Sequence, residues 1–307
     1  MRTMKRIAAA AAASLVAVGL AACNSGTPTG GAASGETPAS GSSSASALTF
    51  PVNDKVDLTG SPTFDTMKSA GKVRIGVKED QPGLGYKDAV TGERTGFDIY
   101  IAEWMAAELG FSADQIEWQT IPSANREQAL INGDIDYYVG TYSITDKRKA
   151  QVGFAGPYFI TGQGLLVLKS NTDINSDKDL AGKTVCSATG STPIQNIKEN
   201  YPDTKTTEFD TYSQCVEALK DGSVDAVTTD QAILMGYASQ EPDTLKTVGE
   251  PFTTEKYGIG VAHDDSALRH YMNKVLTDGG ATWTKIFDAT LGVSGTKVEQ
   301  PSVDDYE

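Results

Sequence analysis

A pattern of eight residues occurs twice in this chain, and it limits the possible folds more than any other feature of the sequence. Residues 129–136 and 218–225 each begin with Ala-Leu, place a glycine fifth, and end on an apolar residue followed by Asp. This order is typical of a helix end, a glycine cap and a buried strand. A single such join arises often by chance, but its recurrence favours two lobes built on one plan. A ligand would then bind in the crevice between them, at the C-terminal ends of strands.

Strand and helix patterns alternate along the rest of the chain. Strands are expected over 72–77, 116–121, 134–140, 183–187 and 224–228, and helices over 97–110, 125–132, 193–200, 212–221 and 266–277. Asp98 is expected to cap the first of these helices. Alternation of this kind predicts the α/β class with mostly parallel sheets.

The N-terminus predicts export rather than fold. Residues 1–22 carry a basic start and an apolar stretch that is too short to span a bilayer, as in a secretory signal peptide. Small residues directly before Cys23 resemble the bacterial lipobox, so we expect Cys23 to be lipidated; the alternative is an ordinary signal peptide with an incidental cysteine. Residues 23–50, rich in Ser, Gly and Thr, are expected to form a disordered tether. The lipid would be the only membrane contact, on the extracytoplasmic face of a Gram-positive type of cell surface.

Composition excludes several classes of partner. The chain of 307 residues has 26 Lys and Arg against 40 Asp and Glu, which argues against binding to nucleic acid. Its 2 His and 3 Cys show no zinc spacing, so neither a metal nor a cofactor is expected. In an exported domain, Cys186 and Cys215 most simply form a disulfide; two buried thiols are the alternative.

Hydroxyl groups and an arginine follow the third predicted strand. Thr141, Ser143 and Arg148 form a possible site for a carboxylate, because a guanidinium pairs with that group through two hydrogen bonds. The alternative is that Thr145 caps a helix that carries a solvated charge run. Residues 189–191 (Thr189, Gly190 and Ser191) open another predicted helix, whose backbone N–H groups suit an anion, although ordinary turns look the same.

Three further charged positions also end strands or begin helices. Asp230 suits an ammonium group, or it caps the next helix. Arg126 stands at a helix start, against the helix dipole, which suggests that it binds a second carboxylate; a solvated arginine is the alternative. Lys78 ends the first strand, where a side chain faces the crevice or remains solvated.

The span from about 64 to 293 resembles the amino-acid-binding proteins of ABC importers, the bacterial solute-binding family 3. The motifs that carry the resemblance are Gly96 to Asp98, Ser143 to Arg148, Phe154 to Tyr158, Asp179 to Val185, Gly222 to Asp225 and Gly279 to Phe287. The resemblance implies a two-lobed periplasmic-binding-protein fold of type II, with the ligand cleft between lobes joined by two crossover strands. Lobe 1 would comprise 51–160 and 256–307, and lobe 2 would comprise 161–255.

The resemblance also implies roles for single residues. Arg148, Ser143 and the N–H groups near Gly190 would bind the ligand α-carboxylate, and Asp230 with the Thr141 region would hold the ammonium. In glutamate- and aspartate-binding members, a Ser-x-Asn-Arg motif and a basic residue after the first strand reach the side-chain carboxylate. Ser123, Asn125, Arg126 and Lys78 match these positions, although that basic residue can be arginine in the relatives. Gln81 to Gly85 is similar to Gram-positive glutamate-binding lipoproteins.

These roles predict a monomeric binding lipoprotein, not an enzyme, that delivers L-glutamate, or next aspartate, to the permease of an ABC importer. Charge counting agrees, because three cations (Lys78, Arg126 and Arg148) against Asp230 match two carboxylates and one ammonium. The alternatives are a binding protein for glutamine or asparagine, a dehydratase-like enzyme, or a sensor module on the same fold. Residues 294–307 are expected to be a loosely held acidic tail.

Overall fold

The computed structural model describes residues 48–295 and 297–306. The predicted signal peptide (1–22), the lipidated Cys23 and the tether as far as residue 47 lie outside the described residues. Within the described ranges, no helix has the length and apolar character needed to cross a membrane.

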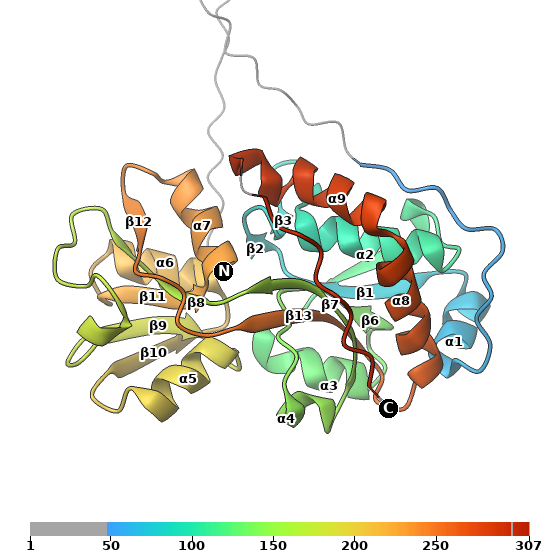
Figure 1. Ribbon diagram of the computed structural model, residues 1–307, viewed down its shortest axis with the longest axis horizontal. Coiled ribbons are helices and arrows are strands. Elements are labelled where there is room, and N and C mark those ends of the chain that lie inside the picture. The colour runs from blue at the N-terminus through green and yellow to red at the C-terminus, as the bar shows by residue number, and fades with distance from the viewer. Residues whose placement is uncertain (1–47, 296, 307) are drawn as a thin grey trace, which may run out of the picture. The chain divides into compact units, whose positions relative to one another are not determined.

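Two five-stranded sheets and a small three-stranded sheet form the framework (Figure 1). The first sheet has the order β5 (Ile116–Thr120), β1 (Val73–Val77), β6 (Tyr137–Tyr138), β13 (Glu255–Val261) and β7 (Gly153–Thr161). The second has the order β10 (Lys205–Phe209), β9 (Thr184–Ala188), β11 (Ala226–Asp230), β8 (Gln163–Leu168) and β12 (Leu245–Val248). The small sheet consists of β2 (Asp80–Gln81), β3 (Gly85–Lys87) and β4 (Arg94–Thr95).

Helices complete two lobes around the two large sheets. We call the first sheet and its helices lobe 1: α1 (Pro62–Ala70), α2 (Phe97–Glu108), α3 (Arg126–Ile131), α4 (Asp146–Lys149), α8 (Ser266–Asp278) and α9 (Gly280–Ala289). The second sheet and its helices are lobe 2: α5 (Thr192–Asn200), α6 (Tyr212–Lys220) and α7 (Gln231–Gln240). Short 3-10 turns are η1 (Ala113–Gln115), η2 (Ser123–Asn125), η3 (Asp177–Asp179) and η4 (Leu291–Ser294). In Figure 1, α2 and α9 lie on one side of the first sheet and α3 lies on the other.

The two sheets share one pairing pattern, and the predicted α/β class is confirmed. In the first sheet β1 pairs in parallel with β5 and β6, and β13 pairs antiparallel with β6 and β7. In the second, β9 pairs in parallel with β10 and β11, and β8 pairs antiparallel with β11 and β12. The sheets are therefore mixed rather than mostly parallel, because each contains strands from the segments that connect the lobes.

The chain passes from lobe 1 to lobe 2 between β7 and β8, and it returns between β12 and β13. The two strands at the passage, β7 and β13, pair with each other from Gly153 to Thr161. The exact lobe boundaries expected from the sequence stay a prediction.

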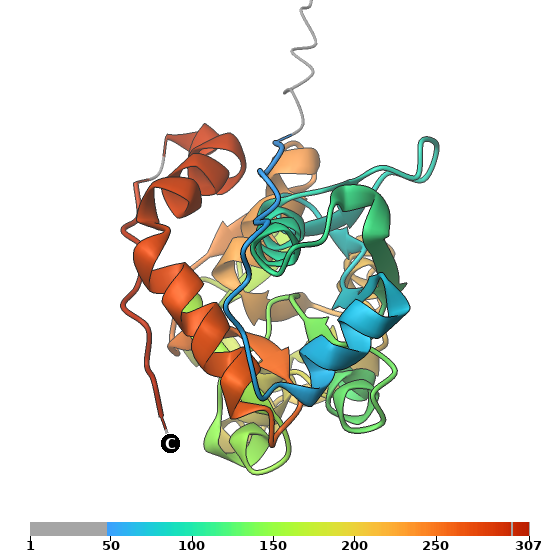
Figure 2. The same cartoon turned by 90° about the vertical axis from the view of Figure 1, so that its right-hand side faces the viewer.

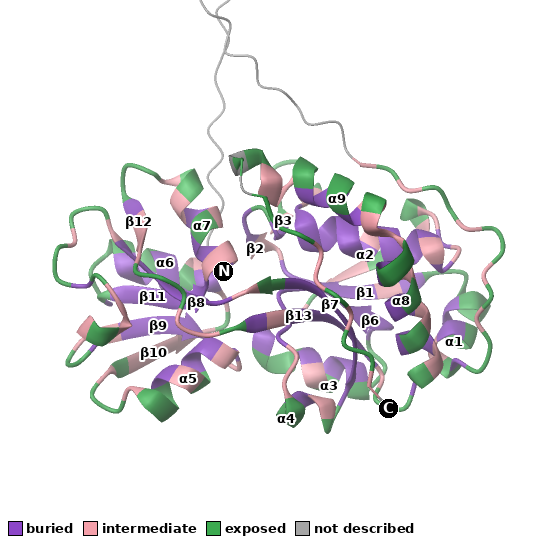
Figure 3. Ribbon diagram, in the orientation of Figure 1, coloured by how far each residue is buried: buried purple, intermediate pink, exposed green. Residues whose placement is uncertain are grey.

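Buried apolar side chains from α2, α9 and β7 fill the space above the first sheet. The Trp283 and Phe287 rings stack at a centroid distance of 5.3 Å, and the Phe97 ring meets Trp283 edge-on at 5.8 Å. The central strands and α2 are buried, whereas outward helix faces are exposed (Figure 3). This packing fixes the start of α2, and so the position of Asp98.

The predicted role of Asp98 as a helix cap is wrong. The N-cap is Gly96, where a Cβ atom would lie 2.1 Å from the Leu84 carbonyl oxygen. Asp98 is fully buried; its Oδ2 accepts from the Thr141 N–H (2.9 Å) and its Oδ1 from the Tyr158 hydroxyl (2.8 Å). Burial raises the pKa of Asp98 to about 6, against the effect of those two donors. The carboxylate therefore holds Thr141 in its left-handed conformation, with φ 47°.

Several elements differ from the sequence-based expectations. The third strand is only β6, Tyr137–Tyr138, although the Asp136 and Val139 N–H groups on either side still donate to carbonyls of β1. Helix α7 was not expected; it contains Gly236, and an internal glycine weakens a helix signal.

The expectation of a loose C-terminal tail is wrong for residues 297–306. The Phe154 N–H donates to the Tyr306 hydroxyl (2.8 Å), and the Asp304 N–H donates to the Gly156 carbonyl (2.9 Å). Asn273 of α8 donates to Asp305 at 2.9 Å. Figure 2 shows this segment running beside α8.

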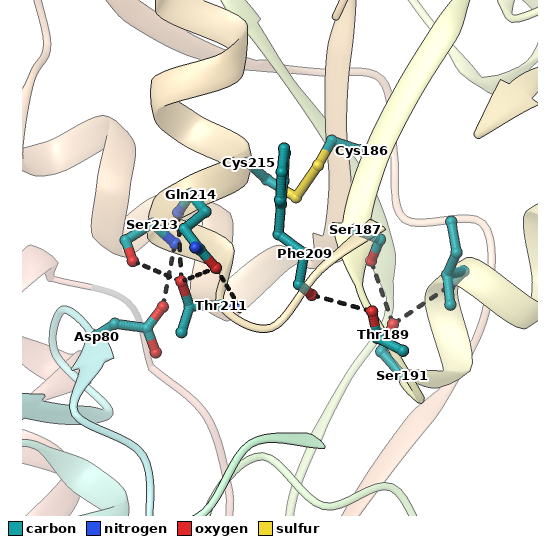
Figure 4. The surroundings of a disulfide bond; sticks show 11 residues. Asp80, Cys186, Ser187, Thr189, Ser191, Phe209, Thr211, Ser213, Gln214 and Cys215 are labelled. Atoms are coloured by element: carbon teal, nitrogen blue, oxygen red, sulfur yellow. Dashed lines mark hydrogen bonds between the residues drawn. A yellow bond between two sulfur atoms is a disulfide. The ribbon is translucent and has the colours of Figure 1, made fainter. Parts of the chain in front are cut away.

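A disulfide joins Cys186 of β9 to Cys215 of α6, with a Cα–Cα distance of 5.4 Å. The disulfide expectation is confirmed, and the alternative of two free thiols is not. Figure 4 shows the bond between β9, just before the loop that carries Thr189 and Ser191, and α6, just after its start at Thr211 and Ser213. It therefore connects two segments of lobe 2 that face lobe 1.

Removing the disulfide should lower the free energy of unfolding by about 3 to 4 kcal/mol, because it closes a loop in the unfolded chain. The test compares the double variant Cys186→Ala and Cys215→Ala with wild type in denaturant titrations. A reductant should destabilise wild type to the same extent and leave the double variant unchanged. Reaction of Cys186 or Cys215 with a maleimide in the native, unreduced protein would contradict the bond.

Candidate functional site

Most of the predicted site residues meet where the two lobes face each other. Lys78 follows β1, Thr141 and Ser143 follow β6, and Asp230 ends β11. The members buried from solvent are Lys78, Ser123, Arg126, Thr141, Ser143, Arg148, Ser191 and Asp230. Thr189 and Gly190 are half-buried, whereas Asn125 is exposed, so the structure does not bring its side chain into this cluster.

Two guanidinium groups share the ring of Tyr142. The Cζ atom of Arg126 lies 4.3 Å from the ring centroid, and that of Arg148 lies 5.1 Å from it. Among the described residues, Arg126 donates one long hydrogen bond, from Nη1 to the Thr141 carbonyl (3.4 Å), and its buried Nε has no partner. The Tyr142 hydroxyl is also buried without a partner. Arg126 therefore has hydrogen-bonding capacity to spare.

Arg148 is held from three directions. Its Nε pairs with Glu127 at 3.0 Å, and its Nη1 donates to the Ser143 carbonyl at 2.7 Å. Its Nη2 donates to the Gly190 carbonyl of lobe 2 at 3.1 Å. Thr145 does cap α4, so the helix-cap alternative is correct for that residue, but Arg148 itself is buried rather than solvated. Glu127 was not anticipated, and only its position next to Arg126 could have indicated it.

Lys78 is a buried cation without a carboxylate partner. Its Nζ donates to the Ser123 hydroxyl at 2.8 Å. Burial and then the charge of Arg126 lower the pKa of Lys78 to about 7. Neither Lys78 nor Arg126 takes part in any ion pair between described residues. This end of the site is therefore positively charged and unneutralised.

Asp230 forms the opposite end of the site. Its Oδ2 accepts from the Tyr257 hydroxyl at 2.7 Å, and its buried Oδ1 has no partner. It stands at the N-cap position of α7 but its side chain makes no capping bond, so the capping alternative is wrong. Burial and then the charge of Glu255 raise the pKa of Asp230 to about 8.

Glu255 is a second carboxylate at this end, and the sequence analysis missed it. It begins β13 and is buried; it accepts from the Thr192 hydroxyl (2.9 Å) and from the Thr253 hydroxyl (3.0 Å). With Glu127, it corrects the charge count made from the sequence. The three cations face three carboxylates rather than Asp230 alone. No sequence signal marks Glu255, because its partner Thr192 is distant in the chain and belongs to lobe 2.

The loop at 189–191 contacts lobe 1 through its backbone. Gly190 has a φ of 76°, and a Cβ atom there would lie 2.7 Å from Cα of Ala124. Ser191 caps α5 by accepting from the Ile194 N–H, and its own N–H donates to the Ala188 carbonyl. The side chain of Thr189 donates to the Phe209 carbonyl at 3.3 Å. The loop thus places the start of α5 against Ser143 and Arg148.

Among the described residues, several buried polar side-chain atoms without partners belong to these two ends or to the residues next to them in the chain or in contact with them. They are Arg126 Nε, Tyr142 Oη, Thr229 Oγ1 and Asp230 Oδ1. Buried polar atoms are normally hydrogen-bonded, so such a cluster is typical of a binding site. A small molecule with anionic and cationic groups at fixed spacing fits this arrangement. Among the described residues, no group of three or more His, Cys, Asp or Glu side chains is placed to hold a metal ion.

Comparison with known proteins gives a consistent result. Residues 73–289 match the bacterial extracellular solute-binding proteins, family 3. The glutamate-binding protein GluB of Corynebacterium glutamicum is 39% identical over 258 residues, which cover 80% of this chain and 86% of that protein. The glutamine-binding protein of Geobacillus stearothermophilus is 43% identical over 206 residues, covering 67% and 78%.

A solved structure shows the same fold. An ancestral arginine-binding protein bound to arginine superposes with a TM-score of 0.68 at 38% identity, covering 72% of this chain and 99% of that one. Relatives with similar folds are thus named for different amino acids. The side chains of the site must therefore decide which amino acid each protein binds.

The raised pKa of Asp230 predicts a stability cost. Between its ordinary value of 3.8 and about 8, the folded chain binds a proton that the unfolded chain has lost, so wild-type stability falls as the pH rises. Asp230→Asn should therefore unfold with a free energy higher than wild type by on the order of 2 kcal/mol at pH 9, and nearly equal at pH 4. Denaturant titrations at both pH values test this, with the exposed Asp203→Asn as control. A pH-independent difference would contradict it.

Proposed function

Because this chain belongs to family 3 of the bacterial extracellular solute-binding proteins, we propose that it binds an acidic amino acid, L-glutamate first and aspartate next. The proposal includes delivery of the ligand to the permease of an ABC importer. It also includes an extracytoplasmic location with Cys23 as the lipid-bearing residue. No chemical step is required of the site, because its charged groups suit recognition.

The observation that carries the ligand assignment is the pair of buried cations without carboxylate partners. Lys78 and Arg126 lie at one end of the site, and Arg126 has a free donor there. A buried charge without a partner is costly, so a ligand carboxylate between these two groups would be strongly favoured. An amide would leave both cations unneutralised.

The remaining groups suit the two charges on the amino-acid backbone. Arg148 and Ser143 would bind the α-carboxylate, with the loop at 189–191 closing on it from lobe 2. Asp230, supported by Glu255 and by Thr141, would hold the ammonium. Asn125 has no part in the proposal, because its side chain is exposed.

Glutamine is the second candidate, and one observation favours it. Glu127 already pairs with Arg148, and Glu255 lies beside Asp230, so the three cations of the site already face three carboxylates. A ligand with a neutral side chain would preserve that balance. We place glutamate first because the ion pair of Glu127 is with Arg148, at the α-carboxylate end, and leaves Lys78 and Arg126 unneutralised.

Calorimetric titration of the full chain with glutamate, aspartate, glutamine, asparagine and arginine tests the assignment. Glutamate should bind most tightly, and glutamine at least about 100-fold more weakly, since it leaves buried cations unpaired. Arg126→Ala and Lys78→Met should each weaken glutamate binding by about 30-fold or more.

Lys72→Met is the matched control. Lys72 directly precedes β1, the strand that Lys78 follows, and it pairs at the surface with Glu117. It should leave affinity unchanged. Tight glutamine binding would reverse the order of the candidates while retaining amino-acid binding. Binding of no amino acid would instead favour a sensor or an enzyme. Product formation would identify the enzyme.

The two shifted pKa values predict how glutamate affinity depends on pH. Above about pH 7, Lys78 of the ligand-free site loses its proton and its positive charge, which weakens binding of a carboxylate. Below about pH 8 the free site protonates Asp230, which weakens binding of an ammonium. Affinity should thus rise up to pH 7, stay level to pH 8 and fall above it.

Titrations between pH 5.5 and 9 measure this profile. In Lys78→Met the fall above pH 8 should disappear, while the rise below pH 7 remains. A wild-type profile that rises as far as pH 8 and does not fall above it would show that Lys78 does not face a ligand carboxylate.

A further inference from the structure

The segment 80–82 lies in the chain between β1 and α2 of lobe 1, so we count it with lobe 1, and it contacts lobe 2 through Asp80 and Pro82. We propose that Asp80 is a positioning residue: it latches the two lobes shut from outside the site and so sets how long an amino acid stays bound. The proposal rests on the proposed function for its ligand. It concerns a residue to which neither the sequence nor the proposed function gives a role.

Asp80 makes three contacts with two helices of lobe 2. Its Oδ2 accepts from the Ser213 N–H of α6 at 3.0 Å and from the Tyr237 hydroxyl of α7 at 3.1 Å. The same hydroxyl lies 2.5 Å from the Asp80 carbonyl oxygen. Figure 4 shows the carboxylate directed at the start of α6, near the disulfide.

The start of α6 suits a carboxylate. Ser213 is in the first turn, so its N–H has no acceptor within the helix, and the helix dipole is positive there. The helix caps itself at the next residue, where the Thr211 hydroxyl accepts from the Gln214 N–H at 3.4 Å. Asp80 therefore satisfies from lobe 1 a donor that lobe 2 leaves open, through a charge-assisted bond.

A glycine on α7 admits the same segment. A Cβ atom on Gly236 would lie 2.2 Å from the Pro82 carbonyl oxygen, a distance that no side chain tolerates. Gly236 is in a helix interior, where alanine is intrinsically preferred. The close approach of the lobes supplies a reason for glycine at this position.

The latch lies beside the ligand groups: Asp80 lines a small cavity together with Lys78, two residues before it in the chain. Asp80 lines an outer groove of about 730 Å³ with Tyr237 and Glu217. The next residue, Gln81, is buried and bonds to the Thr141 hydroxyl at 3.2 Å. Neighbouring residues of β2 therefore face different partners, one in lobe 2 and one in the site.

These contacts require closed lobes, so their free energy acts on the closing equilibrium. Removing them lowers the closed fraction, and the apparent affinity falls by the same factor. The loss should appear mainly in the dissociation rate, as is usual among variants of one binding site.

The test uses the full chain, glutamate calorimetry and stopped-flow dissociation. Asp80→Ala should weaken binding about 10-fold, mostly through faster dissociation, and Asp80→Asn less, because an amide oxygen still accepts from Ser213. Gly236→Ala should weaken binding similarly without lowering unfolding stability, since alanine favours the helix. Glu217→Gln is the matched control: it removes a charge from the same groove, but Glu217 pairs only with Lys220 of lobe 2. Equal affinities for Asp80→Ala and the control would overturn the latch.

Amide hydrogen exchange gives a second readout, and it separates this proposal from the ligand assignment. The Ser213 N–H should be protected in wild type, more so with glutamate, and lose protection in Asp80→Ala. The Gln214 N–H should keep its protection in both, because its acceptor lies in lobe 2. If no amino acid binds wild type, the proposed function fails, and Ser213 exchange in the ligand-free chain alone decides. Unchanged Ser213 exchange in Asp80→Ala overturns the latch.

Discussion

The site depends on one electrostatic constraint: charges removed from water between the lobes must be neutralised there. The charge of Arg148 is neutralised within the protein, because Arg148 pairs with Glu127 and donates to carbonyls of both lobes. The charges of Lys78 and Arg126 are not neutralised by any ion pair between described residues. The same holds for Asp230, whose Oδ1 has no partner there. The opposite pKa shifts of Lys78 and Asp230 have the same physical origin, burial of a charge without sufficient compensation. These buried charges lower the stability of the ligand-free protein, and under the proposed function a charged ligand would offset that cost.

Part of the fold was predictable because its elements are locally encoded: the expected strands correspond to β1, β5, β6, β9 and β11, whereas the other strands of the two large sheets were not named. Hydrophobic periodicity and glycine caps identified strands and helices such as β9 and α6, and cysteine counting identified the disulfide. Helix α7 was missed because Gly236 weakens its local signal, and the reason for that glycine is a contact with Pro82 of lobe 1. Asp98 was misassigned for the same kind of reason: a carboxylate in a first turn looks like a cap until its distant partners are known.

The location of the candidate site was predictable where a charged residue follows a predicted strand, as for Arg148 or Asp230, while the roles of these residues stay predictions. It was not predictable where function depends on which segments meet. Glu255 becomes part of the site only because β13 returns beside lobe 2, where Thr192 reaches it. Counting charges along the sequence therefore overestimated the positive charge of the site. Asn125 shows the converse, since a motif position can match while its side chain faces solvent.

Movement of the lobes would act on several parts of the protein together. The connecting strands β7 and β13, the candidate site and the contacts of Asp80 are joined by short elements. The C-terminal segment contacts both connecting strands: the Asp304 N–H donates to the Gly156 carbonyl of β7, and the Asp304 carboxylate accepts from Lys256 of β13. Strand β2 holds Thr141 through Gln81 and lobe 2 through Asp80. The disulfide fixes α6, which receives Asp80, to β9, which leads into the loop at Gly190. A ligand that draws Gly190 toward Arg148 would therefore also bring Ser213 toward Asp80, because within lobe 2 the two segments move together.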